Sequence, residues 1–167
     1  MQQLDLFRDA PAPSGFTTCD EVTRPVIMPD TIEDDELLAA LPQAGMADSI
    51  VLANEAGRRR ITAAIPALEA LCRRFAGFGA DRMVPEQGAA IDALAQIGGT
   101  EAAQALARLI ARRTLQGPSL HRALNTAGSL GARLPAATIL ELLRDGDPAI
   151  RADACRFAHD IVARQQA

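Results

Sequence analysis

The arginines are the residues of this sequence whose type and spacing best indicate a binding function. The chain contains 17 arginines and no lysine, and many of the arginines stand in clusters. A guanidinium group binds phosphate through paired N–H donors, so clustered arginines are candidate contacts for a nucleic-acid backbone. The candidates, which stand near the ends of expected helices, are Arg58, Arg59, Arg60, Arg73, Arg74, Arg108, Arg112 and Arg113.

Two interpretations of these arginines stay open from the sequence. If they lie along one edge of a helical body, they form a ridge that binds phosphate groups. Alternatively, Arg73 with Arg74 and Arg112 with Arg113 stabilise the helices that they terminate, because cations at a C-terminal end offset the helix dipole. The second interpretation needs no partner molecule.

Other constellations of reactive residues are weak. Asp153, Cys155 and His159 share an expected helix, but only Cys155 and His159 have the i, i+4 spacing, and two ligands are too few for zinc. His121 is interpreted as part of a solvated face, and the acidic run 33–36 as a first helical turn favoured by the dipole. The chain has no glycine-rich phosphate loop and no GxSxG motif. We therefore predict no metal, no cofactor and no enzymatic activity.

A short apolar peptide at the N-terminus is the most specific motif of the chain. It is too short to form a helix alone in water, and the segment 8–15 that follows has the composition of a linker. The peptide resembles, at all five positions, the motif Gln-Leu-(Ser or Asp)-Leu-Phe that binds the bacterial DNA polymerase sliding clamp. Its residues are Gln3, Leu4, Asp5, Leu6 and Phe7.

The resemblance implies an extended peptide that docks in a preformed groove of the clamp. Leu6 and Phe7 would fill an apolar pocket with help from Leu4, and the Gln3 amide would hydrogen-bond the clamp backbone. Burying a leucine and a phenylalanine contributes roughly 1.5–3 kcal/mol each before ordering costs. The alternative is that the three apolar side chains fold back onto the body as a hydrophobic cap.

The elements that would position these residues are expected to be helices. Hydrophobic residues make up 49% of the chain and recur at helical spacing, and no segment alternates with the period of a strand. Pro85, Pro118 and Pro148 each open such a run, and they are separated by 33 and 30 residues. A period of this size with helical content predicts stacked helix pairs.

Capping signals predict where these helices begin and end. Asp30, three residues before Glu33, is the expected cap of the first helix, and Thr100 the expected cap of another. Gly146, Asp147 and Pro148 combine a C′ glycine, an N-cap and a first-turn proline. The expected helices cover about 30–41, 48–56, 61–75 with the main part from Pro66, 86–97 and 101–113, and three more start near 117, 135 and 148.

Three stretches with this pattern resemble HEAT repeats, closest to the short type of phycobilisome-lyase-like proteins. They are Ala64–Leu71, Ala90–Gly99 and Leu140–Arg151. Arg151 matches an arginine of the family pattern, whereas Gln87 and His121 depart from it. The resemblance covers roughly residues 48–167 and implies an all-α, HEAT-like α-solenoid that serves as a binding scaffold. We expect a flexible tail over 1–29 and the helical repeat domain over 30–167.

The distribution of charge and the cysteine content limit the possible environments of the protein. Residues 1–57 hold 11 acidic residues and 2 arginines, a net charge of −9, whereas residues 58–167 hold 10 and 15, a net charge of +5. The three cysteines lie far apart without a CxxC motif, which indicates reduced thiols in a cytosol. No signal-peptide pattern or membrane-spanning run is present, so we expect a cytoplasmic protein that contacts no membrane.

These observations predict a non-enzymatic adaptor recruited to the sliding clamp in bacterial DNA replication or repair, with a helical surface that contacts DNA or a second protein. A general HEAT-type interaction scaffold without a clamp role is the first alternative. A helical-repeat DNA-repair enzyme that resembles DNA glycosylases is the second. Against the enzyme stands the absence of Trp and Tyr, which would stack on an extruded base.

Overall fold

The fold is helical throughout the part of the chain that the computed structural model describes, residues 31–74 and 82–165, with side chains up to residue 163. The predicted all-α class is confirmed for this part, where no strand occurs. The predicted tail and its clamp-binding-like peptide lie outside the described residues. The α-helices are α1 (Asp34–Ala40), α2 (Met46–Arg58), α3 (Ile65–Arg74), α4 (Pro85–Ile97), α5 (Gly99–Ala111), α6 (Gly117–Ser129), α7 (Ala136–Leu142) and α8 (Pro148–Gln165), with a 3-10 turn η2 (Thr62–Ala64) before α3.

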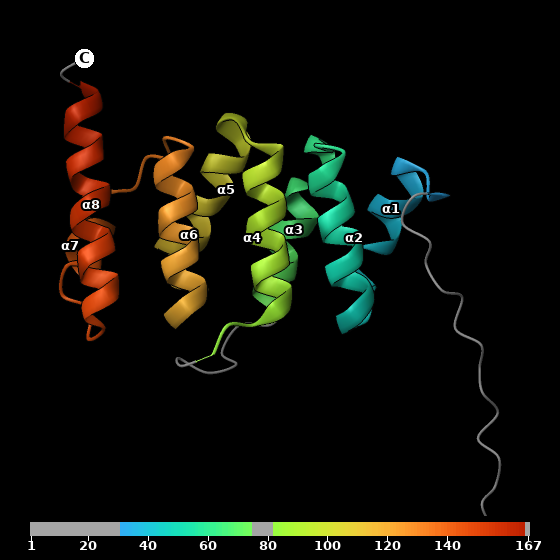
Figure 1. Cartoon of the computed structure of the whole chain (residues 1–167), viewed down its shortest axis with the longest axis horizontal. Coiled ribbons are helices and arrows are strands. Elements are labelled where there is room, and N and C mark those ends of the chain that lie inside the picture. The colour runs from blue at the N-terminus through green and yellow to red at the C-terminus, as the bar shows by residue number, and fades with distance from the viewer. Residues whose placement is uncertain (1–30, 75–81, 166–167) are drawn as a thin grey trace, which may run out of the picture.

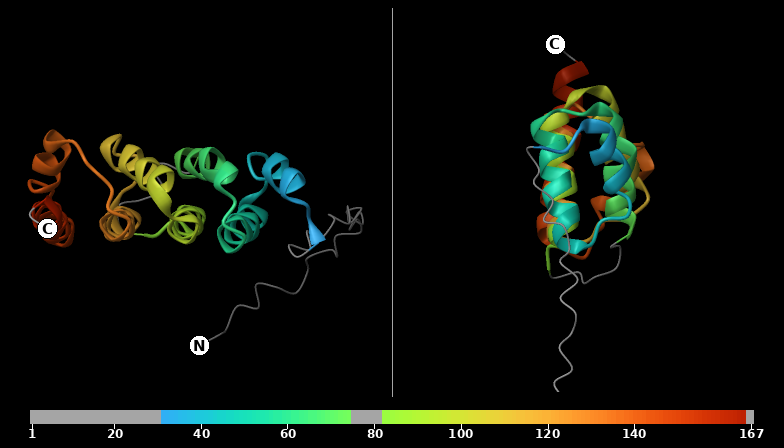
Figure 2. Two further views of the ribbon diagram at one scale, coloured as in Figure 1. Left: turned by 90° about the horizontal axis from the view of Figure 1, so that it is seen from above. Right: turned by 90° about the vertical axis from the view of Figure 1, so that its right-hand side faces the viewer.

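The helices form two layers. Seen from above in Figure 2, α2, α4, α6 and α8 lie side by side in one layer, and α1, α3, α5 and α7 lie in the other. Successive helices run in opposite directions. The C-terminal ends of α3, α5 and α7 and the N-terminal ends of α4, α6 and α8 therefore meet at one long edge of the molecule, which we name the lower edge from its place in Figure 1. The C-terminal ends of α2, α4 and α6 lie at the opposite, upper edge.

Leucine, isoleucine and alanine build the core between the layers. The largest side chains that are completely buried come mainly from α1 to α6, and only one aromatic residue, Phe157, is buried among the described residues. Small residues let the helices approach closely. A Cβ atom on Gly57 would lie 2.8 Å from Cα of Ala93, so α2 and α4 cross almost backbone to backbone. Dense packing of this kind suits a chain that is poor in aromatic residues.

Proline marks the helix starts as the sequence predicts. Pro85 and Pro148 are the first residues of α4 and α8, and Pro118 is the second residue of α6. Proline fits there because its missing N–H has no intrahelical partner in the first turn. The predicted cap before α8 is also confirmed, since Oδ1 of Asp147 accepts the N–H of Ala149 at 2.8 Å.

Two predicted helix starts are wrong. Thr100 is not a cap but the second residue of α5, because Gly98, at φ +69°, turns the chain one residue after α4 ends. The first helix begins at Asp34, with Glu33 as an N-cap that makes no side-chain hydrogen bond. Leu37 and Leu41 are the completely buried residues of this region, and Ile32 packs against the core from the segment before the helix.

The second helix is longer than predicted, and the third is divided. The predicted range 48–56 becomes α2 from Met46 to Arg58, because residues at both ends continue the backbone hydrogen bonds. The predicted break at Pro66 is confirmed, since η2 precedes α3 and Pro66 is the second residue of α3. None of the helices in the described ranges combines the length and the apolar character that crossing a bilayer requires.

Candidate functional site

The structure divides the predicted arginines between the two edges. Arg58, Arg59 and Arg60 follow one another at the C-terminal end of α2, on the upper edge. The five remaining candidates lie at the ends of α3 and α5, on the lower edge. The eight arginines therefore do not form one ridge, because α2 runs antiparallel to α3 and α5. The five candidates of the lower edge are Arg73, Arg74, Arg108, Arg112 and Arg113.

Glu69 organises the lower edge by binding arginines from two helices. Nε and Nη2 of Arg108 donate hydrogen bonds to Oε2 of Glu69 at 3.2 and 2.8 Å. Nη1 of Arg73 donates to Oε1 at 2.9 Å, and Nη1 of Arg112 lies 3.7 Å from the same oxygen. We name these four side chains the Glu69 cluster. The Glu69 side chain is only 8% exposed, whereas those of Arg108 and Arg112 are 43% and 60% exposed.

Helix geometry and layer packing bring the Glu69 cluster together. Arg73 follows Glu69 by four residues on α3, so both side chains lie on one face of that helix. Arg108 lies in the last turn of α5, and Arg112 follows it by four residues. Since α3 and α5 pack side by side in one layer, both α5 arginines face Glu69. Sequence analysis did not identify Glu69, because two of its three partners, Arg108 and Arg112, are 39 and 43 residues away.

The Glu69 cluster carries a surplus of positive charge. Burial raises the pKa of Glu69, but the hydrogen bonds from Arg108 and the charges of Arg73 and Arg112 outweigh it, so the pKa is lowered. The hydrogen bonds to Glu69 raise the pKa of Arg108 further. One negative carboxylate faces three positive guanidinium groups, which leaves a net charge of +2. The cluster can therefore bind a further anion.

A second buried carboxylate, Glu55 on α2, pairs with arginines at the upper edge. Nε of Arg58 donates to Oε2 of Glu55 at 2.8 Å, and Nε of Arg59 donates to Oε1. Arg59 also bonds Oδ1 of Asp34 at 2.9 Å and the carbonyl of Ile32, which attaches the start of α1 to the end of α2. Hydrogen bonds from Arg58, followed by those from Arg59, lower the pKa of Glu55 to about 2 in spite of its burial.

The charges that take part in the Glu55 contacts balance. Glu55 and Asp34 supply two negative charges, and Arg58 and Arg59 supply two positive charges. We name these four side chains the Glu55 cluster. It differs from the Glu69 cluster in having no net charge, so its geometry indicates a structural role in holding α1 against α2.

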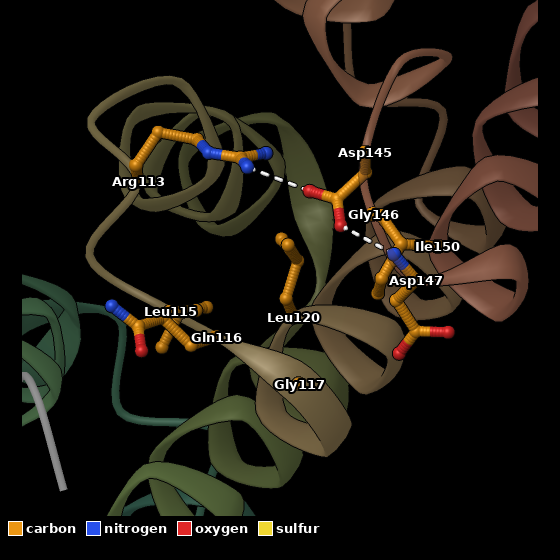
Figure 3. Close-up of a pocket in the computed structure, with 9 residues that line it drawn as sticks. All are labelled: Arg113, Leu115, Gln116, Gly117, Leu120, Asp145, Gly146, Asp147 and Ile150. Atoms are coloured by element: carbon orange, nitrogen blue, oxygen red, sulfur yellow. Dashed lines mark hydrogen bonds and ion pairs between the residues drawn. The ribbon is translucent and has the colours of Figure 1, made fainter. Parts of the chain in front are cut away.

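A pocket of about 480 Å³ opens on the lower edge, beside the end of α5 (Figure 3). Its wall includes an ion pair in which Nη2 of Arg113 lies 2.6 Å from Oδ2 of Asp145, and Oδ1 of Asp145 accepts the N–H of Asp147 at 3.1 Å. The apolar part consists of buried side chains from α6, α8 and the turn between α5 and α6. These are Leu115, Leu120 and Ile150. The pocket can accept an apolar side chain next to the ion pair.

A third polar cluster, which sequence analysis missed, joins α6 and α8. The buried carboxylate of Asp153 binds Nδ1 of His121 and Nη2 of Arg156, and Nδ2 of Asn125 donates to the carbonyl of His121 at 3.0 Å. Asn125, Asp153 and Arg156 border a groove of about 280 Å³. His121 lies on an exposed face as predicted, with 47% of its side chain exposed, but it also binds a buried carboxylate, which was not predicted. No signal in the sequence relates it to a carboxylate 32 residues away.

Thiol and histidine side chains are not assembled into a metal site in the described residues. Cys155 and His159 are both exposed on α8, and no group of three or more candidate ligands occurs in the part of the chain that the structure describes. Cys72 is buried next to the Glu69 cluster. Burial, together with the negative charge of Glu69, raises the pKa of the Cys72 thiol to about 12, so this thiol is unreactive.

The comparisons add no relative to these observations: no family model, no curated protein and no solved structure matches the chain. The candidate peptide Gln3–Phe7 lies outside the described residues. The features that bear on the function are therefore the side chains of the two edges and the sequence of the peptide.

Proposed function

We propose that this protein is a non-enzymatic adaptor that binds the sliding clamp of bacterial DNA replication or repair through Gln3–Phe7. Its helical body is a HEAT-like α-solenoid, and the arginines of the lower edge contact DNA near the clamp. The agreement of the peptide with the clamp-binding motif at all five positions supports the first half of this proposal. The Glu69 cluster supports the second half.

Equivalent contacts in successive helix pairs support the repeat interpretation. Near the start of α4, Nε2 of Gln87 donates to the carbonyl of Cys72 in α3 at 3.1 Å. Near the start of α8, Nη1 of Arg151 donates to the carbonyl of Asp145, just after α7, at 2.8 Å. Both side chains thus bind the C-terminal end of the helix before. Such recurrence is expected when each pair is one structural unit that stacks on its neighbours. His121 departs from it by binding Asp153 instead.

The net charge of the Glu69 cluster is the observation that carries the proposed contact with DNA. Its three arginines remain substantially exposed although they bind a buried carboxylate, so they offer further N–H donors to solvent. Arg74, at the end of α3, adds positive charge to the same edge, whereas the charge of Arg113 is offset by its ion pair with Asp145. A basic stripe on a rigid surface is the electrostatic feature by which proteins bind the phosphate backbone.

Titration of the purified clamp with the full chain tests the first half of the proposal. We expect micromolar affinity, because a short peptide loses conformational freedom when it binds. The double variant Leu6→Ala/Phe7→Ala should weaken binding at least about tenfold, since it removes the two side chains that fill the apolar pocket. Phe16→Ala/Ile27→Ala is the matched control, because it removes the same amount of apolar side chain outside the motif. Equal binding by both double variants would contradict the clamp assignment.

The pocket beside Arg113 favours a second candidate function, a general protein-interaction scaffold without a clamp role. A concave site with an apolar floor and an ion pair on its wall suits a side chain of another protein. This candidate predicts that the clamp does not bind in the same titration. It also predicts that Leu120→Ala, which enlarges the floor, alters partner binding while clamp affinity stays undetectable.

A further inference from the structure

Glu69 is a buried carboxylate that contacts three arginines of the lower edge. We propose that Glu69 is a positioning residue that holds Arg73, Arg108 and Arg112 as a preformed site for the phosphates of duplex DNA. This inference rests on the proposed function, because it names the partner of the lower edge and the residue that prepares it. Sequence analysis identified the arginines as candidates but not the carboxylate.

Glu69 is placed to fix the arginines before any ligand binds. Arg108 donates to it through Nε and Nη2, a two-point contact that restricts rotation of the guanidinium plane. Arg73 is fixed from the other side by a bond of 2.9 Å to Oε1. Because Glu69 is itself almost completely buried, its own position is set by the packing of α3. Side chains ordered in advance lose less entropy when they bind a partner.

The arginines still have donors for a second anion. Each guanidinium has more N–H groups than its contact with Glu69 uses, and the three side chains are between 43% and 60% exposed. The cluster has a net charge of +2, so an approaching phosphate meets attraction from more than one group. The Glu55 cluster offers the internal contrast, since its named charges balance and Arg59 is turned inward, with 21% of its side chain exposed.

Several features favour duplex DNA over other polyanions. The exposed arginines of the Glu69 cluster come from the ends of two neighbouring helices, α3 and α5, so the positive charge is shared by two elements. In the α7–α8 turn, by contrast, Asp145 and Asp147 offset the nearby arginines. Guanidinium groups from two helices can contact more than one phosphate of a nucleic-acid backbone. The chain has no Trp or Tyr to stack on unpaired bases, as single-strand binders commonly use. An acidic protein partner is the competing class.

The experiment uses the variant Glu69→Gln, because two physical explanations predict opposite changes in its affinity for duplex DNA. The full chain is titrated, without the clamp, onto a labelled duplex of roughly 20 base pairs at several salt concentrations between about 50 and 200 mM. If Glu69 only neutralises arginines, Glu69→Gln removes a negative charge, raises the net positive charge of the site and strengthens DNA binding. If Glu69 positions them, we expect Glu69→Gln to weaken binding about fivefold. Stronger or unchanged binding would overturn the inference.

A second variant tests the site independently of Glu69. Arg108→Gln/Arg112→Gln should weaken duplex binding about tenfold and reduce the slope of log affinity against log salt by about 2. The matched control is Arg60→Gln/Arg133→Gln, which removes the same charge from exposed positions in the segments that follow α2 and α6. An equal loss in the control would overturn the site. If circular dichroism shows that Glu69→Gln does not fold, this pair of variants decides the question.

Further measurements distinguish a failure of this inference from a failure of the proposed function. Tighter binding to a single strand than to the duplex, or competition by polyglutamate at equal charge concentration, would overturn the choice of duplex DNA. Absence of any duplex binding at low salt would overturn both this inference and the DNA half of the proposed function. Clamp binding, which is measured without DNA, is independent of all these outcomes.

Discussion

Glu55 and Glu69 are two buried carboxylates that bind arginines, yet their partners have different origins. Arg58 and Arg59 follow Glu55 by three and four residues on the same chain segment. The strongest partner of Glu69 is Arg108, which belongs to another helix and lies 39 residues away. The Glu55 cluster is therefore assembled mainly by the geometry of one helix, and the Glu69 cluster by the packing of two helices.

The difference in origin produces a difference in charge. Local spacing lets Glu55 collect two arginines, and the start of α1 contributes Asp34, so the named charges balance. Packing of α3 against α5 adds Arg108 and Arg112 to the local partner Arg73 without a second carboxylate, so a positive surplus remains around Glu69. A chain can thus make one edge structural and the opposite edge available for an anion with the same two residue types.

Removal of each carboxylate gives the largest expected effect on stability. Glu69→Ala should lower the free energy of unfolding by about 2–3 kcal/mol, because it releases α3 from α5 and leaves three cations close together, although their exposure limits the cost. Glu55→Ala should cost about 1–2 kcal/mol, since its partners are mostly on its own helix. Urea unfolding of both variants measures the difference. A larger loss for Glu55→Ala would reverse the comparison.

Removal of one arginine from each cluster should have a smaller effect. Arg108→Met keeps apolar stem contacts but removes the hydrogen bonds between helices, so we expect a loss of about 1–2 kcal/mol. Arg58→Met removes a contact within one helix whose guanidinium is largely exposed, and we expect about 0.5 kcal/mol. The midpoints of urea denaturation provide the measurement. Equal losses would show that the connection between α3 and α5 contributes no more than a local pair.

Acid should weaken the Glu55 contact over a defined range. Because the folded pKa of Glu55, about 2, is below its ordinary value of 4.5, its stabilising effect is complete above pH 4.5 and is lost as the pH falls toward 2. Glu55→Gln should remove this part of the pH dependence. Chemical denaturation at several pH values measures it, and the carboxyl carbon shift of Glu55 gives its midpoint. A midpoint near 4.5 would contradict the strong contact with Arg58.

The smallest effect concerns two arginines in the left-handed backbone region. Arg60 has φ +55° and Arg113 has φ +52°, at the ends of α2 and α5, where glycine is the least strained residue. Arg60→Gly should stabilise the protein by about 0.5–1 kcal/mol, because it relieves backbone strain. Arg113→Gly should be nearly neutral, since it also removes the ion pair with Asp145. Thermal unfolding tests both variants, and a clear stabilisation by Arg113→Gly would show that the ion pair contributes nothing.

The helices could largely be predicted from the sequence because their signals are local. Pro85, Pro118 and Pro148 restrict their own backbone, and Asp147 caps a helix two residues on. The predicted N-caps at Thr100 and Asp30 were wrong, because capping signals are also local and do not tell neighbouring candidates apart. Several residues near each start have similar capping propensity, and the choice among them depends on a glycine at positive φ or on which turn reaches the core.

The candidate site could be predicted only in part. The arginines were visible as clusters, but their division between two edges follows from helix direction, and their common partner Glu69 looks like any other acidic residue in the sequence. The contact of His121 with Asp153 was missed for the same reason, because Asp153 reaches it from a different helix. A contact between residues far apart in the chain leaves no mark in the spacing of either residue.

The amino-acid sequence by itself determined that this chain forms helices, where most of them begin, and that its second half carries a positive surplus. These properties depend on backbone conformation, helical periodicity and composition, which act over a few residues. Only the tertiary structure decided which charges meet. The packing of α3 against α5 places three guanidinium groups around one buried carboxylate, because the distance between charges in space, rather than in sequence, sets their interaction.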